Sequence, residues 1–355
     1  MTRKNLTHNY IAHNYTGKKV FIGIDVHLKK YAVTAVCDRQ VEKKWVMPAN
    51  GLELVNTLRR QYPGAEIHSV YEAGFSGFVL HRTLTEKGIN NMVVNPSSVA
   101  ISSGDRVKTD RRDSEKLALH LSAGLLQDKK VYVPTLEMEY ARQPSRLRQQ
   151  LIKDRTRVMV QIRRRLYHFG YAICIDRKLS YREVEELVAK FPKTGELRFC
   201  IESHLDGWKN IDQRIKKTDE RLAIQAEHCP LEELYRSVPG IGRITSRILA
   251  TELGDMSFLH SAKALFKYVG LTPVEFSSAD RIRRGHISRQ GKPLLRKVLT
   301  EAAWVAIRKD PNLLKYYQSL KKKDKQKIAI VAVARKLVGR TRAILKAKGV
   351  YKMAA

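Results

Sequence analysis

Apolar and polar positions follow a strand-like pattern at the start of the chain. From Lys19 to about Met47 three short segments, VFIGIDV, YAVTAVC and KKWVM, have the apolar or alternating character of strands, separated by polar breaks short enough for hairpin turns. Helical spacing then predicts helices over 52–62 and 77–87. A strand in EIHSVYEA lies between them, and a short apolar strand, NMVVNP, follows and ends at a proline. We expect three antiparallel strands followed by alternating helices and strands.

A further helix is predicted near Asp113, because Leu117, Leu121 and Leu125 recur at intervals of four residues. The resulting order, β-β-β-α-β-α-β-α, is typical of a mixed sheet with helices packed on it. The N-terminal part of the chain is therefore predicted to be an α/β domain.

Two long helices are predicted next. From Arg142 to Phe169 apolar residues recur at intervals of three and four while arginines crowd the remaining positions, and the stretch from about Glu196 to Glu227 has a comparable apolar stripe. The two helices could pair as an antiparallel coiled coil or mediate dimerisation. The pattern fits a helical linker as well as it fits a specific RNA or dimer contact.

The character of the chain changes after Pro230, where SVPGIGRITSRILATELGD has two glycines, Gly240 and Gly242, in a tight turn between helical segments. This is the pattern of a helix-hairpin-helix, whose turn can hold a phosphate with backbone N–H groups. A simple packing corner between two helices fits equally well. We divide the chain into a polar N-terminal extension (1–18), an α/β catalytic domain (19–130), a helical coiled-coil region (140–229) and a mostly α-helical C-terminal domain with the hairpin and a basic tail (230–355).

The charge of the chain indicates its partner. It has 67 Lys and Arg against 35 Asp and Glu, a formal net charge of +32. Such a protein is expected to bind a polyanion, and nucleic acid is favoured because lysines and arginines displace the counterions of its phosphates. From Arg281 onward there are 22 Lys and Arg but only three acids. No apolar run approaches the ~20 residues of a membrane span, and the N-terminus lacks the apolar region of a secretory signal, so we expect a cytoplasmic, nucleoid-associated protein.

Four carboxylates are placed where they could share a metal ion. Asp25 lies within the first strand, Glu72 ends the fourth, and Asp110 and Asp113 open a helix at a spacing that puts both on one face. Each acid alone would suggest a helix cap or a turn. Together they suggest a divalent cation, because converging carboxylates need one, and oxygen ligands favour Mg²⁺ or Mn²⁺. Two such ions ~4 Å apart can catalyse phosphoryl transfer.

His27 follows Asp25 by two positions and is predicted to line the strand rather than to approach the metal. Arg111 and Arg112, between the paired aspartates, are predicted to contribute modestly to substrate binding. The full set of predicted nucleic-acid contacts comprises the basic residues and turn glycines of these motifs: Lys108, Arg111, Arg112, Gly240, Gly242, Arg281, Arg283, Arg284, Arg289, Lys292 and Arg296.

Six motifs occur in a characteristic order: GIDVH, YEAG, KTDRRDSEKLA, VPGIGRITSRILATELGD, KALFKYVGLTP and RGHISRQGKPLLRKVLTEAAW. In this order they resemble the DEDD-type insertion-sequence transposases related to the Piv invertases, over nearly the whole chain. The resemblance implies an RNase H/RuvC-like fold for the N-terminal domain. It also implies that Asp25, Glu72, Asp110 and Asp113 are the metal-binding catalytic tetrad.

The same resemblance implies a serine nucleophile in the C-terminal domain that becomes covalently joined to DNA. The family has a Ser-Gly pair at this position, and VEFSSADRIRRGHIS puts Ser278 there. Because Ala279 stands where the family has glycine, Ser277 and Ser288 remain alternatives. Activation of a serine requires help with the developing negative charge, which metal ions and nearby arginines can supply.

Further implications of the resemblance concern partners: double-stranded donor and target DNA, a dimer or tetramer held partly by the coiled-coil helices, and a structured noncoding bridge RNA that selects the DNA. The rival function is that of a RuvC-like junction nuclease, which uses metal-activated water and needs no serine. A non-catalytic nucleic-acid-binding protein with structural acids is a further alternative.

Overall fold

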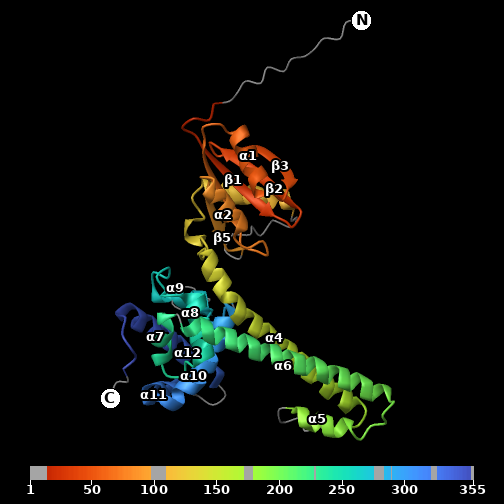
Figure 1. Cartoon of the computed structure of the whole chain (residues 1–355). Coiled ribbons are helices and arrows are strands. Elements are labelled where there is room, and N and C mark those ends of the chain that lie inside the picture. Colours follow the sequence, from red (N-terminus) through yellow and green to blue (C-terminus); the bar gives the residue numbers. More distant parts are fainter. Residues whose placement is uncertain are drawn as a thin grey trace. The chain divides into compact units, whose positions relative to one another are not determined.

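The computed structural model describes residues 14–96, 109–171, 179–227, 229–275, 284–288, 290–320 and 326–352. The chain divides into two compact units, Met1–Pro134 and Thr135–Ala355, which are described separately (Figure 1). Within the described ranges, no helix combines the length and the apolar character that crossing a membrane requires.

The N-terminal unit contains a five-stranded sheet in the order β3-β2-β1-β4-β5. The first three strands are antiparallel, whereas β4 runs parallel to β1 and β5 runs parallel to β4. This confirms the predicted mixed sheet with three antiparallel strands at its start. The strands are β1 (Lys19–Val26), β2 (Lys30–Cys37), β3 (Gln40–Pro48), β4 (Glu66–Glu72) and β5 (Asn90–Val94).

Helices cover both faces of this sheet. Successive side chains of β1 point to opposite faces of the sheet, so Val20, Ile22 and Ile24 pack in one apolar core and Phe21 packs against the other. The first core is completed by leucines of α1 and α2, and the second by leucines of α3. The helices are α1 (Gly51–Gln61), α2 (Val79–Glu86) and α3 (Asp110–Ser122), followed by a short 3₁₀ turn, η2 (Gln127–Lys129).

Helix α3 approaches β1 at Gly23 more closely than any side chain would permit. A Cβ atom at Gly23 would lie 2.0 Å from the Ser114 carbonyl oxygen and 2.5 Å from the Ala118 nitrogen. Thr34, which pairs with Gly23 on β2, has its buried hydroxyl 2.9 Å from that of Ser114. Glycine at this position therefore brings the first turns of α3 directly onto the centre of the sheet.

Two long helices of the C-terminal unit run side by side, α4 (Leu136–His168) and α6 (Glu196–Glu227), with α5 (Tyr181–Val188) packed near one end (Figure 1). Ion pairs join Arg148 to Asp219 and Arg155 to Asp212. Because residue numbers rise along α4 as they fall along α6, the pair is antiparallel. The predicted helices are thus present and pair within one chain.

The remaining helices of the unit share one large apolar core, built from buried residues between Tyr235 and Leu345. A two-stranded antiparallel ribbon, β6 and β7, lies between α9 and α10 in the sequence. These elements are α7 (Pro230–Ser237), α8 (Arg243–Leu253), α9 (Ala262–Val269), β6 (Pro273–Glu275), β7 (Arg284–Ile287), α10 (Pro293–Lys309), α11 (Pro311–Leu320) and α12 (Gln326–Ala347).

Candidate functional site

Neighbouring parallel strands carry Asp25 and Glu72 to the same edge of the sheet. Ile24 of β1 pairs with Tyr71 of β4, and the two acids are the next residues along these strands. Ile24 and Tyr71 point into the core beneath α1 and α2. Since successive side chains alternate, Asp25 and Glu72 are directed toward the face that α3 covers.

The first turn of α3 supplies the other two acids. Thr109 caps this helix, its side chain accepting a hydrogen bond from the Arg112 N–H, so that the helix begins at Asp110 and includes Asp113 in its first turn. The N-terminal end of a helix stabilises negative charge. Together with the close approach at Gly23, this capping brings the acidic turn of α3 toward Asp25.

The structure brings Asp25 and Asp110 together with His27. The Nε2 atom of His27 lies 3.0 Å from Oδ2 of Asp25 and 3.2 Å from Oδ2 of Asp110. One potential ligand atom from each of the three residues lies within 4.8 Å of the others. Lys30, at the start of β2, donates a hydrogen bond of 2.8 Å to the same Asp110 oxygen.

Glu72 and Asp113 are not members of this compact group of ligand atoms. Both side chains are half-buried. The negative charge of Asp113 contributes to the raised pKa of Asp25. In the structure the predicted tetrad thus consists of one close pair of carboxylates, Asp25 and Asp110, with two acids outside that pair.

The two central carboxylates have pKa values shifted in opposite directions. Burial raises the pKa of Asp25; His27 opposes this shift, and the negative charges of Asp110 and Asp113 add to it. The hydrogen bond from Lys30 lowers the pKa of the more exposed Asp110. A half-buried carboxylate beside like charges gains from a bound cation, which favours its ionised form.

His27 was predicted to line the strand, and this prediction is wrong, because its ring nitrogen lies between the two aspartates. A signal for its position was present in the sequence: His27 is the first residue after β1, and in an extended chain a residue two positions from Asp25 lies on the same side, toward α3. Lys30 was missed altogether, because 80 residues separate it from its partner Asp110.

These residues fit a divalent cation. Asp25 and Asp110 offer carboxylate oxygens, the ligands that Mg²⁺ and Mn²⁺ prefer, and an imidazole nitrogen from His27 suits a transition metal better than Mg²⁺. His27 and Lys30 both approach the same oxygen of Asp110, so a metal ion ligated by that oxygen would compete with them. Arg111 and Arg112 are exposed on the first turn of α3, beside the acids.

The two glycines between α7 and α8 have different surroundings. Gly240 has φ +85°, and a Cβ there would lie 2.2 Å from the Ala302 carbonyl oxygen of α10. Gly242, the residue that precedes α8, has open space where a Cβ would be. Gly240 is therefore a packing position, whereas Gly242 leaves the N-terminus of α8 accessible.

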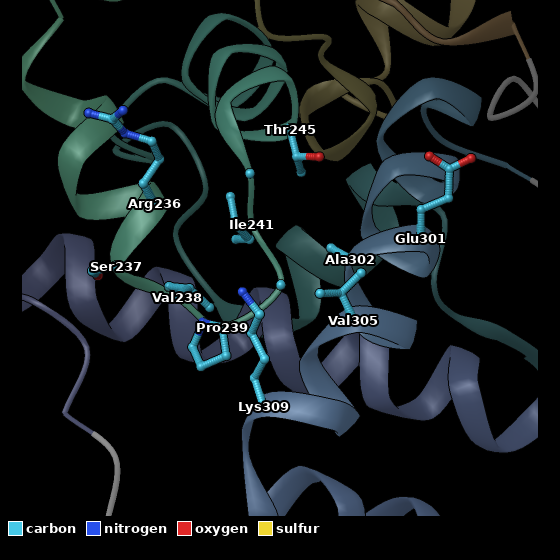
Figure 2. A pocket seen from close by; sticks show the side chains of 12 residues that line it. Arg236, Ser237, Val238, Pro239, Ile241, Thr245, Glu301, Ala302, Val305 and Lys309 are labelled. Atoms are coloured by element: carbon cyan, nitrogen blue, oxygen red, sulfur yellow. The ribbon is translucent and has the colours of Figure 1, made fainter.

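A pocket of about 550 Å³ lies between this turn and α10. Figure 2 shows Lys309 reaching past Pro239 on one side, with Glu301 further along α10 and Arg236 on the far side of the turn. Two cations and one acid thus surround the backbone of the turn. The helix-hairpin-helix role of this turn stays a prediction.

The remaining predicted contacts are only partly within the described residues. Ser277, Ser278, Lys108, Arg281, Arg283 and Arg289 lie outside them, and of Arg284 only the backbone is described, in β7. The backbone N–H of Ser288 donates to the Thr272 carbonyl oxygen. Lys292 precedes α10, where burial lowers its pKa, and Arg296 donates to the Gln290 carbonyl oxygen at 3.4 Å.

Two family models match the chain in separate regions. Residues 22–169 match the DEDD transposase model of the IS110 group, and residues 232–318 match the model described as transposase IS116/IS110/IS902 family. The first match contains all four carboxylates and His27; the second contains the α7–α8 turn and extends through the C-terminal helices as far as α11. Together the two matches span about two thirds of the chain.

Individual relatives are similar over most of their length. The chain is 28% identical to the putative transposase y4qE of Sinorhizobium fredii, over 81% of this chain and 72% of that protein. It is 24% identical to the transposase for insertion sequence element IS1533 of Leptospira borgpetersenii, over 81% and 85%. It is 28% identical to the pilin gene-inverting protein of Moraxella lacunata, over 72% of each chain. With the acidic site on a mixed five-stranded sheet, these matches show that the chain belongs to the IS110/IS116 family of DEDD insertion-sequence transposases.

Proposed function

We propose that this protein is a DNA recombinase that cuts and rejoins strands for a mobile element. The observation that carries the proposal is the convergence of Asp25, Asp110 and His27 at the sheet edge, inside the region matched by the DEDD transposase model. The net charge of +32 supports nucleic acid as the substrate.

Asp25 and Asp110 would hold a metal ion, with His27 beside them and Glu72 and Asp113 completing the acidic tetrad. When bound, Mg²⁺ or Mn²⁺ would supply charge stabilisation for phosphoryl transfer. Lys30, which donates to Asp110, helps to fix the orientation of that carboxylate. Arg111 and Arg112, exposed on the same turn, would attract and orient the DNA phosphate.

Ser278 is the proposed nucleophile. Its Oγ forms an ester bond to phosphorus while the bond from phosphorus to one deoxyribose oxygen breaks, and that oxygen takes up a proton. The support is sequence position: Ser278 follows the GLTP segment and precedes the basic run that includes Arg281, Arg283 and Arg284. Ser277 and Ser288 are the alternatives.

We further propose that the active assembly is a dimer or tetramer, in which tetrad and serine come from different subunits, and that a structured bridge RNA selects donor and target DNA. Both proposals rest on family resemblance and on the basic character of the chain. Sequencing the RNA that copurifies from the native host tests the second one. A single structured RNA encoded beside the gene supports it; a heterogeneous mixture contradicts it.

The catalytic proposal is tested by trapping DNA-linked protein on denaturing gels. Asp25→Asn should reduce strand cleavage at least about 10³-fold, roughly 4 kcal/mol of transition-state stabilisation. Ser278→Ala should abolish the covalent product, whereas Ser277→Ala, the adjacent control, should retain it. Cleavage that survives in Ser278→Ala without any protein-linked DNA would instead establish a hydrolytic, junction-nuclease reaction.

A further inference from the structure

The α4–α6 pair has two flanks that differ in charge balance. On one flank arginines of α4 pair with aspartates of α6, Arg148 with Asp219 and Arg155 with Asp212. The opposite flank is hollowed into a groove of about 780 Å³. Leu151 and Thr218, buried between the helices, form part of its lining.

Three cations of α6 line this groove: Arg214, Lys217 and Arg221. Their spacing of three and four residues places them on one stripe of the helix, and all three are exposed. Among the described residues, no carboxylate forms an ion pair with any of them. The first flank is closed by ion pairs across the helices, whereas the α6 cations of the second have no such partners.

The α4 side of the groove does not neutralise these cations. Asp154 is the acid among the described residues that line it, and its carboxylate lies 3.0 Å from Arg157 of the same helix. Arg146 adds a further cation, whose guanidinium makes two hydrogen bonds to buried Glu252. Three positive charges therefore remain uncompensated along one stripe.

A polyanion is the occupant that this charge pattern fits. A second copy of the chain would bring the same cationic stripe, and like charges oppose such a contact. From Arg214 to Arg221 the stripe extends about 10 Å along the helix, at about 1.5 Å per residue. That length matches about three base-pair steps of duplex DNA at about 3.4 Å each along one strand.

We propose that the α4–α6 groove is a backbone-contact site for double-stranded DNA, separate from the acidic site and from the α7–α8 turn. The inference rests on the proposed function in taking DNA as the substrate. The contacts are to phosphates, so the groove adds affinity and positions the duplex without reading its sequence.

The test is the salt dependence of DNA binding by the full-length protein, measured with a duplex DNA probe by fluorescence anisotropy in EDTA. In the triple variant Arg214→Ala, Lys217→Ala and Arg221→Ala, binding should weaken on the order of tenfold to a hundredfold. The slope of log K against log salt should become shallower by about 2 to 3, at about 0.9 per lost phosphate contact.

The matched control removes three other exposed cations of the same unit, Lys190, Lys193 and Lys216. Lys216 is adjacent to Lys217 but about 100° away around the helix. The control should keep the parental slope. Equal slopes in the two triple variants, or a loss confined to an RNA duplex of the same sequence, would overturn the proposal. Circular dichroism and thermal unfolding should show both variants folded.

Failure of this inference can be told apart from failure of the proposed function. Binding is read without metal and without strand cleavage, so Asp25→Asn should keep the parental affinity and slope. The groove variant should recover cleavage when the salt concentration is lowered, because its acidic site is intact. If the groove variant binds DNA with the parental affinity and slope, the proposed DNA contact in the groove is refuted. The recombinase proposal is then unaffected.

Discussion

Carboxylates in the two units of the molecule are balanced in different ways. In the C-terminal unit Glu252 is only 3% exposed, and its two oxygens accept hydrogen bonds from Arg146 at 2.8 and 3.1 Å. Arg142, equally buried, donates to the carbonyl oxygens of Thr251 and Glu252 at the end of α8. In the N-terminal unit Asp25 and Asp110 are 25% and 39% exposed; they share His27, and Lys30 donates to Asp110.

This difference separates acids that are paired in the buried core from acids that lie at an accessible sheet edge. The chain provides cations for Glu252 and for Glu232, whose carboxylate lies 2.9 Å from Arg247, and these pairs connect helices within one unit. At the sheet edge Asp25 and Asp110 lie beside one imidazole, and Lys30 donates to Asp110. A buried acid that is paired within the fold holds two helices together, whereas two neighbouring carboxylates at an accessible edge can ligate a cation.

The largest expected effect is on stability, when the buried acid Glu252 is replaced. Glu252→Gln leaves the buried Arg142 without a negative partner and removes the carboxylate that the exposed Arg146 contacts. It should reduce the free energy of unfolding by about 3–5 kcal/mol. Chemical denaturation measures this loss. Exposed Glu220→Gln, the control, should change stability by less than about 0.5 kcal/mol. An unchanged free energy of unfolding in Glu252→Gln would show that the buried ion pairs do not stabilise the fold.

The α7–α8 turn provides the next test, because its two glycines differ. Gly240→Ala should destabilise the protein by about 3 kcal/mol: positive φ contributes about 1–2, and overpacking against α10 a further ~1–3. Gly242→Ala, with open space at its Cβ position, should lose less than about 1 kcal/mol. Thermal unfolding distinguishes the two. Similar losses for both variants would contradict the packing role assigned to Gly240.

Metal ions should act on the acidic cluster only. Adding Mn²⁺ or Mg²⁺ at a hundred times the dissociation constant should stabilise the folded protein by about 2.7 kcal/mol. Asp25→Asn should abolish this increase, whereas Glu220→Gln should retain it. The measurement is the melting temperature with and without metal. An equal shift in Asp25→Asn would place the metal elsewhere.

The smallest expected effect is the pH dependence of stability without metal. The pKa of Asp25 is raised in the folded state, so the contribution of this group favours folding below its unfolded pKa and is lost as the pH rises through the folded value. Urea unfolding over a pH series in EDTA should show this decline in the parent but not in Asp25→Asn. The same slope in both would mean that Asp25 is not the titrating group.

Local patterns along the chain were enough to predict the elements and most of the candidate site residues. Alternation predicted β1 to β3, spacing of three and four predicted α4 and α6, and the positions of Asp25, Glu72, Asp110 and Asp113 indicated an acidic site. These properties are local, because each residue's place on a strand or helix depends on its own segment. The excess of basic residues is likewise set by composition alone.

Which of these residues lie in contact depends on how the elements pack in three dimensions. It placed His27 and Lys30 against Asp110, separated the Asp25–Asp110 pair from Glu72 and Asp113, and gave the α4–α6 pair one neutralised and one cationic flank. Periodicity tells which way a side chain points, but the distance between two elements depends on how closely they pack. At Gly23 that distance is set by a missing Cβ, which lets α3 bring its acids to the sheet.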